Sequence, residues 1–329
     1  MKIFGLVAIG HTYGLLFAFN MHEWWKKDKN RFYYRNKPGI FEYRGCDSIS
    51  ILLYLIMIII VSMSEVITIS HIETKDLSIG YEKENVVQNL TINIPKGKIT
   101  SFIGANGCGK STILKTIARL HKPRSGSVLL DGKDIHSLST KEIAMQMAIL
   151  PQSPEAPVGM TIYELVSYGR YPYQKGMGRL TAKDKEVIEW ALGVTGMSAF
   201  HDRHVDELSG GQRQRAWIAM ALAQETELVL LDEPTTYLDM AHQMEVLELL
   251  NHLNQKEGRT IAMVLHDINQ AVRFSDYICA LKKGKVVHFG KAEEVMTKEV
   301  LLEVFGIHAT IVTDPNTNKP VCLSYDLAH

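Results

Sequence analysis

The segment from Gly104 to Ser111, which reads Gly-Ala-Asn-Gly-Cys-Gly-Lys-Ser, constrains this chain more than any other part of it. It fits the pattern GxxxxGK[ST], and it lies between an apolar stretch, Ile99 to Ile103, and residues that predict a helix to about Leu120. In this context glycines let backbone N–H groups turn towards phosphate oxygens at the positive end of the helix. Lys110 is then expected to reach the β and γ phosphates and Ser111 to ligate magnesium, and a chance glycine-rich turn is the weaker alternative.

A second informative feature is the apolar stretch from Leu228 to Leu231, which ends in two carboxylates, Asp232 and Glu233. Beside a phosphate-binding loop, Asp232 is predicted to hold magnesium directly or through water. Glu233 is predicted to orient or deprotonate the attacking water. Two solvated acids at a strand end are the alternative, which the presence of the loop disfavours.

A third feature is the sequence Ser209-Gly210-Gly211-Gln212, which precedes a predicted helix running to Ala223. A serine and two glycines at a helix start form a possible second anion site. By themselves they would read as an ordinary helix cap. Their position between Gln152, which follows a strand, and the acidic strand favours the anion site, as does His266 at the end of a later strand.

The order of strand, loop, helix and strand predicts an α/β fold with a mostly parallel sheet. Three further regions complete the predicted architecture: β-rich stretches at Ile67 to Leu77 and Val86 to Ile94, and a helix-rich insertion between about Ile162 and Ala223. Later elements are predicted as a helix over Ala241 to Gln255, a strand over Thr260 to Leu265, and a helix over Glu293 to Phe305. The expected fold is a P-loop NTPase core with an antiparallel β subdomain and a helical insertion subdomain.

The predicted domain boundaries are an N-terminal extension over residues 1–62, a nucleotide-binding domain over 63–314 with its helical subdomain at about 152–224, and a tail over 315–329. The extension holds two apolar runs, Ile3 to Phe19 and Ile49 to Val61. The second run has only about 13 residues, against the roughly 20 that a membrane helix needs. A membrane hairpin, a partner-binding appendage and translation assigned from an upstream start codon remain open. The last is favoured because Met63 directly precedes the first predicted strand.

Charge and cysteine usage exclude some classes of function. Basic and acidic residues both number 36, so the formal net charge of zero disfavours a nucleic-acid partner. The four cysteines are scattered without a CxxC pair, which disfavours a zinc site and favours a reduced, cytosolic compartment.

Taken together, the motifs resemble those of the nucleotide-binding domain of the ATP-binding-cassette family over about residues 67 to 314. The resemblance implies that the chain binds ATP with Mg²⁺ and hydrolyses the nucleotide. The residues implied to contact ATP are Tyr81, Gly104, Ala105, Asn106, Gly107, Cys108, Gly109, Lys110, Ser111, Thr112 and Gln152. Tyr81 would stack on adenine, although a tyrosine in a β-rich stretch is more often a packing residue.

The same resemblance implies how the reaction would be divided among the side chains. The metal would be held by Ser111, Gln152 and Asp232, and catalysis would rest on Glu233, His266 and Lys110. Gln152 would also touch the attacking water, and His266 would contact the γ-phosphate. Without the family pattern, Gln152 would read as an exposed loop residue and His266 as a structural histidine.

The family resemblance also implies partners. The signature residues Ser209, Gly210, Gly211 and Gln212 would close the ATP held by a second copy of the chain, and Asp239 would lie at the interface of this homodimer. The dimer would be peripheral, at the cytoplasmic face of the cell membrane. It would drive membrane permease subunits and act indirectly with an extracytoplasmic substrate-binding protein.

The helical insertion narrows the resemblance to import ATPases for ferric siderophores, through Leu150-Pro151-Gln152, the segment Thr161 to Val166, and the segment Tyr168 to Tyr173. Haem, cobalamin or another metal chelate remains an alternative cargo, because the cargo does not touch this subunit. Gln152 and the region Tyr163 to Tyr173 are the expected docking place of the permease. Less favoured rivals are a soluble ATPase of DNA repair or the ribosome, a binding module with a dead site, and an exporter with a fused membrane domain.

Overall fold

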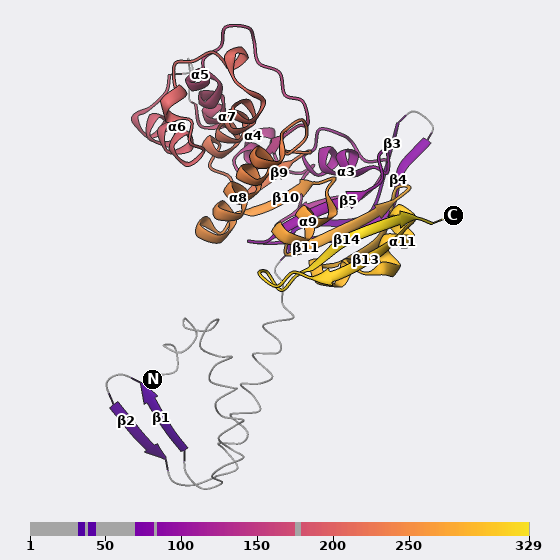
Figure 1. Ribbon diagram of the computed structural model, residues 1–329. Helices are drawn as coiled ribbons and strands as arrows, with labels where there is room; N and C mark the ends of the chain where they lie inside the picture. The colour runs from indigo at the N-terminus through magenta and orange to yellow at the C-terminus, as the bar shows by residue number, and fades with distance from the viewer. Residues whose placement is uncertain (1–31, 37–38, 44–69, 82–83, 175–178, 329) are drawn as a thin grey trace. The chain divides into compact units, whose positions relative to one another are not determined.

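A computed structural model describes residues 32–36, 39–43, 70–81, 84–174 and 179–328 of the chain (Figure 1). The chain divides into two units, Met1–Thr68 and Ile69–His329. In the first unit, β1 (Phe32–Asn36) pairs antiparallel with β2 (Gly39–Tyr43). The two apolar runs of the N-terminal extension and the proposed start at Met63 lie outside the described residues. Among the described residues, no helix is both long and apolar enough to cross a bilayer.

The second unit is built around a six-stranded sheet with the order β12-β11-β5-β10-β9-β8, in which only β12 runs antiparallel to its neighbour. The strands are β5 (Ile99–Gly104), β8 (Met147–Leu150), β9 (Leu228–Leu231), β10 (Thr260–Val264), β11 (Tyr277–Lys282) and β12 (Lys285–Lys291). Every residue of β5, β9 and β10 is buried, which explains why these strands read as continuous apolar runs. The prediction of a mostly parallel core is confirmed.

A second sheet is antiparallel and has the order β4-β3-β6-β7. Its strands are β3 (Ser70–Tyr81), β4 (Glu84–Pro95), β6 (Ser125–Leu130) and β7 (Lys133–Asp134). Helix α3 (Lys110–Ile117) buries Ile113, Leu114 and Ile117 in one apolar cluster with Phe102 of β5 and Val128 of β6. The helix that follows the phosphate-binding loop is therefore packed against both sheets.

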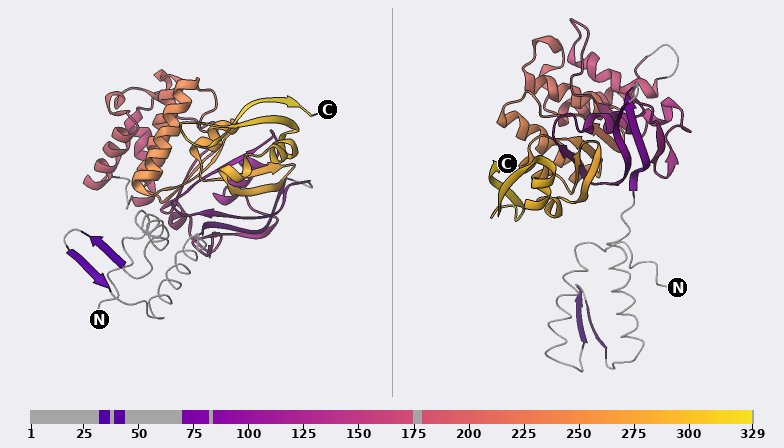
Figure 2. Two further views of the ribbon diagram at one scale, coloured as in Figure 1. Left: turned by 60° about the horizontal axis from the view of Figure 1, so that its bottom comes forward. Right: turned by 90° about the vertical axis from the view of Figure 1, so that its right-hand side faces the viewer.

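The insertion between the two halves of the core is helical, as predicted. Its elements are α5 (Ile162–Ser167), the 3₁₀ helix η2 (Tyr168–Tyr173), α6 (Ala182–Val194), the 3₁₀ helices η3 (Ser198–Phe200) and η4 (Val205–Glu207), and α7 (Gly210–Ala223). A shorter helix, α4 (Thr140–Ala144), precedes β8. Helices α5, α6 and α7 each begin with a capping box, whose first residues are Thr161, Thr181 and Ser209. In both views of Figure 2 these helices stand together on one side of the sheets of the second unit.

The C-terminal part differs in detail from the expectation. Its elements are α8 (Met240–Glu257), α9 (Ile268–Phe274), α10 (Ala292–Val295), α11 (Lys298–Phe305), β13 (Ile307–Thr313) and β14 (Pro320–Leu327). The single helix predicted over Glu293 to Phe305 is two helices, because the Thr297 side chain accepts a hydrogen bond from the Val300 N–H and starts α11 anew. The tail, for which no element was predicted, contains β14, which pairs antiparallel with β13.

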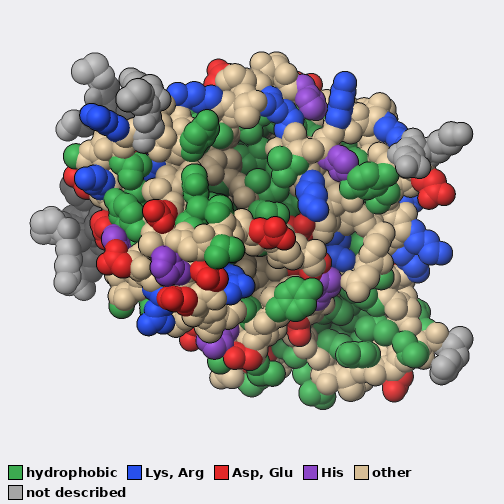
Figure 3. All heavy atoms as spheres, turned by 90° about the horizontal axis from the view of Figure 1, so that it is seen from above, with side chains coloured by type: hydrophobic (Ala, Val, Ile, Leu, Met, Phe, Trp, Pro, Cys, Tyr) green, Lys and Arg blue, Asp and Glu red, His purple; other side chains and the backbone are tan. Residues whose placement is uncertain are grey.

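The surface agrees with the balanced composition. On the face shown in Figure 3, basic, acidic and histidine side chains are interspersed among hydrophobic ones. This mixture fits a chain with 36 basic and 36 acidic residues.

Candidate functional site

The phosphate-binding loop joins β5 to α3, where the sequence predicted it. Gly104, Gly107 and Gly109 have φ values of 146°, 75° and 103°, which side chains disfavour. A Cβ at Gly104 would lie 2.3 Å from the Leu281 carbonyl oxygen, so a neighbouring strand also requires glycine there. The Nζ of Lys110 donates to the carbonyl oxygens of Gly104, at 2.8 Å, and Ala105, at 3.1 Å. The lysine therefore lies over the loop whose phosphate it is predicted to hold.

Asp232 follows β9 directly and is only 2% exposed. Its Oδ1 accepts a 2.6 Å hydrogen bond from the Ser111 hydroxyl, whereas its Oδ2 is buried without a hydrogen-bond partner among the described residues. Burial raises the pKa of Asp232, because a desolvated carboxylate is costly to ionise. A buried oxygen without a partner calls for an explanation. Two hard oxygen donors, Ser111 and Asp232, on a phosphate-binding loop fit Mg²⁺, which commonly uses one or two protein ligands beside substrate phosphates.

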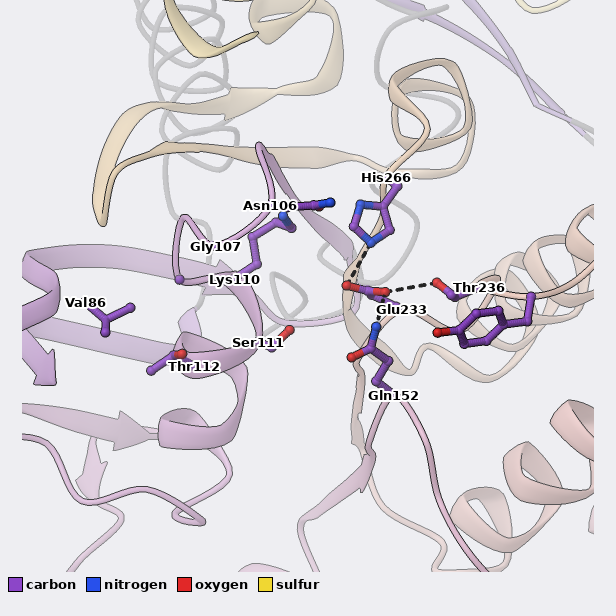
Figure 4. Close-up of a pocket in the computed structure, with 12 residues that line it drawn as sticks. Val86, Asn106, Gly107, Lys110, Ser111, Thr112, Gln152, Glu233, Thr236 and His266 are labelled. Carbon is purple, nitrogen blue, oxygen red and sulfur yellow. Dashed lines mark hydrogen bonds and ion pairs between the residues drawn. The ribbon is translucent and has the colours of Figure 1, made fainter. Parts of the chain in front are cut away.

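Glu233 is the next residue in the chain, and its carboxylate interacts with three donor side chains, as the dashed lines in Figure 4 show. Its Oε1 pairs with His266 Nε2 at 2.7 Å. Its Oε2 accepts hydrogen bonds from the Gln152 amide and from the Thr236 hydroxyl, the latter at 3.0 Å. The Glu233 side chain is 10% exposed, and its φ of 56° is unusual for a residue with a side chain. The carboxylate is thus held in a fixed direction within an enclosed setting.

The strand register explains how residues distant in sequence meet. The backbone N–H of Asp232 donates to Leu150 O at 2.9 Å, which sets the acidic pair beside the end of β8 that leads to Gln152. The N–H of Leu265 donates to Phe102 O at 3.2 Å, which sets His266 beside the strand that leads into the loop. Carboxyl ends of neighbouring parallel strands meet at one edge of a sheet, where ligands commonly bind.

These residues line an open cavity of about 560 Å³. Its lining is Val86, Asn106, Gly107, Gly109, Lys110, Ser111, Thr112, Gln152, Glu233, Thr236, Tyr237 and His266. Val86, Thr236 and Tyr237 were not predicted as site residues. The Thr-Thr pair at 235–236 directly after the acidic strand was a usable signal for Thr236. Val86 gave none, because a valine in a strand reads as core.

Two predicted groups lie apart from this cavity lining. Tyr81 is 47% exposed at the end of β3, with its ring tilted against His121 at a centroid separation of 4.5 Å. Ser209 and Gly210 are exposed at the start of α7. The Ser209 Oγ accepts from the Gln212 N–H at 3.3 Å, and the Gln212 Oε1 accepts from the Ser209 N–H at 3.1 Å.

Asp239 joins the signature residues rather than the cavity. It caps α8, accepting hydrogen bonds from the His242 N–H at 2.9 Å and the His242 Nδ1 at 2.8 Å. Hydrogen bonding from the His242 backbone and side chain lowers the pKa of Asp239. The His242 ring lies against Gly211, where an added Cβ would be 2.4 Å from its Cδ2 atom. Apart from Tyr81, the predicted residues thus fall into two groups, one around the phosphate-binding loop, called the phosphate-loop site below, and one around the start of α7, called the signature site.

A phosphate-binding loop and an acidic strand end beside a parallel sheet define the class of P-loop NTPases. Comparisons with known proteins narrow this class. The ABC transporter family model matches residues 87–236. The iron(3+)-hydroxamate import ATP-binding protein FhuC of Bacillus subtilis (strain 168) is 62% identical over 256 residues, which are 78% of this chain and 95% of that protein. The ferric enterobactin transport ATP-binding protein FepC of Escherichia coli (strain K12) is 46% identical over 254 residues, 77% of this chain and 94% of that protein.

The fold agrees with solved relatives. The dimeric structure of MJ0796, a bacterial ABC transporter cassette, is similar with a TM-score of 0.60 and 30% identity, covering 67% of this chain and 98% of that one. A post-hydrolysis state of the same cassette, bound to ADP and Pi, gives the same TM-score of 0.60. This chain belongs to the ABC transporter family of ATP-binding proteins, and it is an ATPase.

Proposed function

We propose that this chain is the ATP-hydrolysing subunit of an importer for iron(3+)–siderophore complexes. The observation that supports the proposal most is the 62% identity to FhuC over 95% of that protein's length. The petrobactin import ATP-binding protein FpuD of Bacillus anthracis, at 53% identity over 254 residues, serves another siderophore. Relatives named for several siderophores favour iron–siderophore complexes as the cargo class, and hydroxamates as the first candidates within it.

We further propose that the phosphate-loop site performs hydrolysis. The loop N–H groups and Lys110 would bind the phosphates of ATP, and the Glu233 carboxylate would take a proton from the attacking water. His266, which pairs with Glu233, would orient that carboxylate and donate to the γ-phosphate. Mg²⁺ held by Ser111 and Asp232 would neutralise charge on the β and γ phosphates. Gln152, bonded to Glu233, would report the occupancy of the site to the docking surface of the helical subdomain.

The second half of the site would come from a second copy of the chain. Ser209 and Gly210 are exposed at the start of α7, and neither is among the residues that line the cavity of their own chain. Tyr237, which does line the cavity, and Met240 are 89% and 80% exposed, and exposed apolar side chains that lie together mark interaction surfaces. A two-fold pair would bury these side chains and bring each signature turn to the partner's phosphate-binding loop. Two ATP molecules would then lie in the interface.

The permease would dock on the helical subdomain and hold the dimer at the membrane as a peripheral component. Among the described residues of this subdomain, three large apolar side chains are exposed: Val158 at 93%, Tyr168 at 55% and Tyr171 at 74%. Aromatic side chains with exposed faces are typical anchors of protein interfaces. An extracytoplasmic binding protein would deliver the cargo to the permease and would not touch this chain.

Complementation tests the proposal. The full chain is expressed in a Bacillus subtilis strain that lacks FhuC, with an iron(3+)-hydroxamate siderophore as the only iron source. A Lys110→Ala chain at the same expression level is the control, because it should lose phosphate binding and keep the docking surface. Growth with the unaltered chain and not with Lys110→Ala supports the proposal.

Two outcomes would contradict it. Growth restored equally by the Lys110→Ala chain would show that ATP hydrolysis by this subunit is not what drives uptake. No growth on the hydroxamate, with growth restored on haem or with cobalamin uptake in matching strains, would assign the same motor to another chelate.

A further inference from the structure

Helix α9 follows the cavity residue His266 after a single residue. That residue, Asp267, caps the helix, with its Oδ1 accepting from the Gln270 N–H at 2.7 Å. A helix is a rigid element, so the place of α9 sets where the backbone of His266 lies. The contacts that hold α9 therefore influence the geometry of the interaction between His266 and Glu233.

One side of α9 is held by the C-terminal hairpin, which is defined here as β13, β14 and the turn 314–319. The Asn269 side chain forms two hydrogen bonds with the backbone of Cys322: its Nδ2 donates to the carbonyl oxygen at 3.1 Å, and its Oδ1 accepts from the N–H at 2.9 Å. Because the Asn269 side chain makes two hydrogen bonds to one residue of β14, it fixes the position of α9 relative to this strand. Cys322 itself is buried, at 8% exposure.

The hairpin also holds the end of α9. The Lys319 Nζ donates to the carbonyl oxygens of Val272 at 2.8 Å, Arg273 at 3.1 Å and Ser275 at 3.1 Å. Carbonyl groups in the last turn of a helix lack partners within the helix, and a cation there also complements the helix dipole. Both ends of α9 are thus anchored to one hairpin, which lies outside the 87–236 segment matched by the family model.

The other side of α9 contacts the signature site. The Gln270 Nε2 donates to the Gln243 Oε1 at 2.6 Å, and the Gln243 Nε2 donates to the Leu238 carbonyl oxygen at 2.9 Å. Leu238 directly precedes Asp239, the cap of α8. A continuous set of hydrogen bonds therefore runs from the hairpin through α9 to the loop that carries Asp239.

We infer that the C-terminal hairpin is a positioning element for ATP hydrolysis, with Asn269 and Gln270 as positioning residues that act through His266 and Asp239. The inference rests on the roles proposed above for His266 and Asp239 and does not depend on the identity of the cargo. Among the described residues, no hydrogen bond of the hairpin or of the Asn269 and Gln270 side chains reaches the phosphate-binding loop, so ATP affinity should be spared. Loosening α9 should lower kcat and leave KM for ATP nearly unchanged.

The test is steady-state ATP hydrolysis by the purified full chain. Asn269→Ala removes two neutral hydrogen bonds, and Lys319→Met removes three contacts while keeping an unbranched side chain. At ordinary hydrogen-bond strengths, each should lower kcat about three- to tenfold, with KM within about twofold. Gln270→Ala, which leaves the hairpin attached, should lower kcat in the same direction. The matched control is Leu323→Ser, a change of a 68% exposed side chain on β14, which should alter neither constant.

Three results would overturn the inference. The first is an unchanged kcat in Asn269→Ala and Lys319→Met despite a lower melting temperature, which would make the hairpin a merely structural appendage. The second is an equal rise of KM and fall of kcat, which would mean that the hairpin also affects ATP binding. The third is an unchanged kcat in Gln270→Ala. His266→Ala, measured alongside, separates the proposed role of His266 from the inference about the hairpin. If His266→Ala retains full kcat, the proposed role of His266 fails. If it is the only variant that loses kcat, the role of His266 stands and only the positioning inference fails.

Discussion

Replacing Asp232 by asparagine should stabilise the protein in the absence of nucleotide and magnesium while it removes ATP hydrolysis. Asp232 is 2% exposed, and of its two carboxylate oxygens only Oδ1 has a hydrogen-bond partner within the described part of the chain, the Ser111 hydroxyl at 2.6 Å. Asparagine keeps this acceptor and the shape of the side chain. It replaces a buried ionisable oxygen with a neutral amide nitrogen that also lacks a partner.

The magnitude follows from this difference. A buried polar group without a partner costs about 1–3 kcal/mol, and a charged one costs more. The asparagine removes only that part of the burial cost which is due to the charge of the carboxylate. We therefore expect about 1 kcal/mol of added stability, or roughly 2–4 °C in melting temperature for a domain of this size. The loss in hydrolysis is larger. Removing a metal ligand should forfeit several kcal/mol of transition-state stabilisation, and about 2.7 kcal/mol already means a hundredfold slower rate.

The assay is thermal unfolding in EDTA and in Mg²⁺ with ATP, together with the hydrolysis rate. Ser111→Ala is the matched comparison, because it removes the one hydrogen bond that the described residues make to the Asp232 carboxylate and should lower the melting temperature in EDTA by a similar amount. Both variants should lose most of the stabilisation by Mg²⁺ with ATP. A lower melting temperature for Asp232→Asn in EDTA, or a full response to Mg²⁺ with ATP, would refute the reasoning.

Three other predictions concern the two sites. Glu233→Gln should slow hydrolysis by about 10² to 10⁴ and yield an ATP-trapped dimer on size exclusion, and undiminished turnover would assign the base elsewhere. Gly211→Ala should weaken the ATP-dependent dimer, because the added carbon would lie 2.4 Å from the His242 ring, and His242→Ala in the same chain should restore it. Tyr81→Ala should raise KM for ATP about fivefold or more, whereas Tyr81→Trp should not, if the ring stacks on adenine.

The strands that the sequence predicted best are those that lie deepest in the sheet. The strand Leu228–Leu231 was predicted with its observed bounds, and Thr260–Val264 was predicted one residue too long, because both faces of these strands are buried and their runs are continuously apolar. The β14 strand escaped prediction because Leu323, Tyr325 and Leu327 are exposed and alternate with polar residues. Half-exposed strands give a weak pattern, and this strand is set by its pairing with β13.

The site shows the same division between local motif and tertiary contact. Lys110, Ser111 and Asp232 could be predicted because spacing and neighbouring strands define their chemistry locally. That Asp232 Oδ2 is buried without a hydrogen-bond partner among the described residues could not be predicted, because this depends on which groups surround the atom in the folded chain. The roles assigned to all the site residues stay predictions, and so do the domain boundaries; these residues are Lys110, Ser111, Asp232, Glu233, His266, Gln152, Tyr81, Asp239 and the signature residues.

By itself, the sequence determined the class of fold, the phosphate-binding loop and the identity of the acids, because these follow from short patterns of glycine, charge and apolar period. Only the tertiary structure decided which side chains meet. Strands β9 and β10 are separate in the chain but neighbours in the sheet, and their pairing sets His266 beside Glu233, with Nε2 and Oε1 2.7 Å apart. The tertiary structure also decided that the C-terminal hairpin forms hydrogen bonds with α9. Long-range pairing is set by the packing of the whole sheet, and no local pattern encodes it.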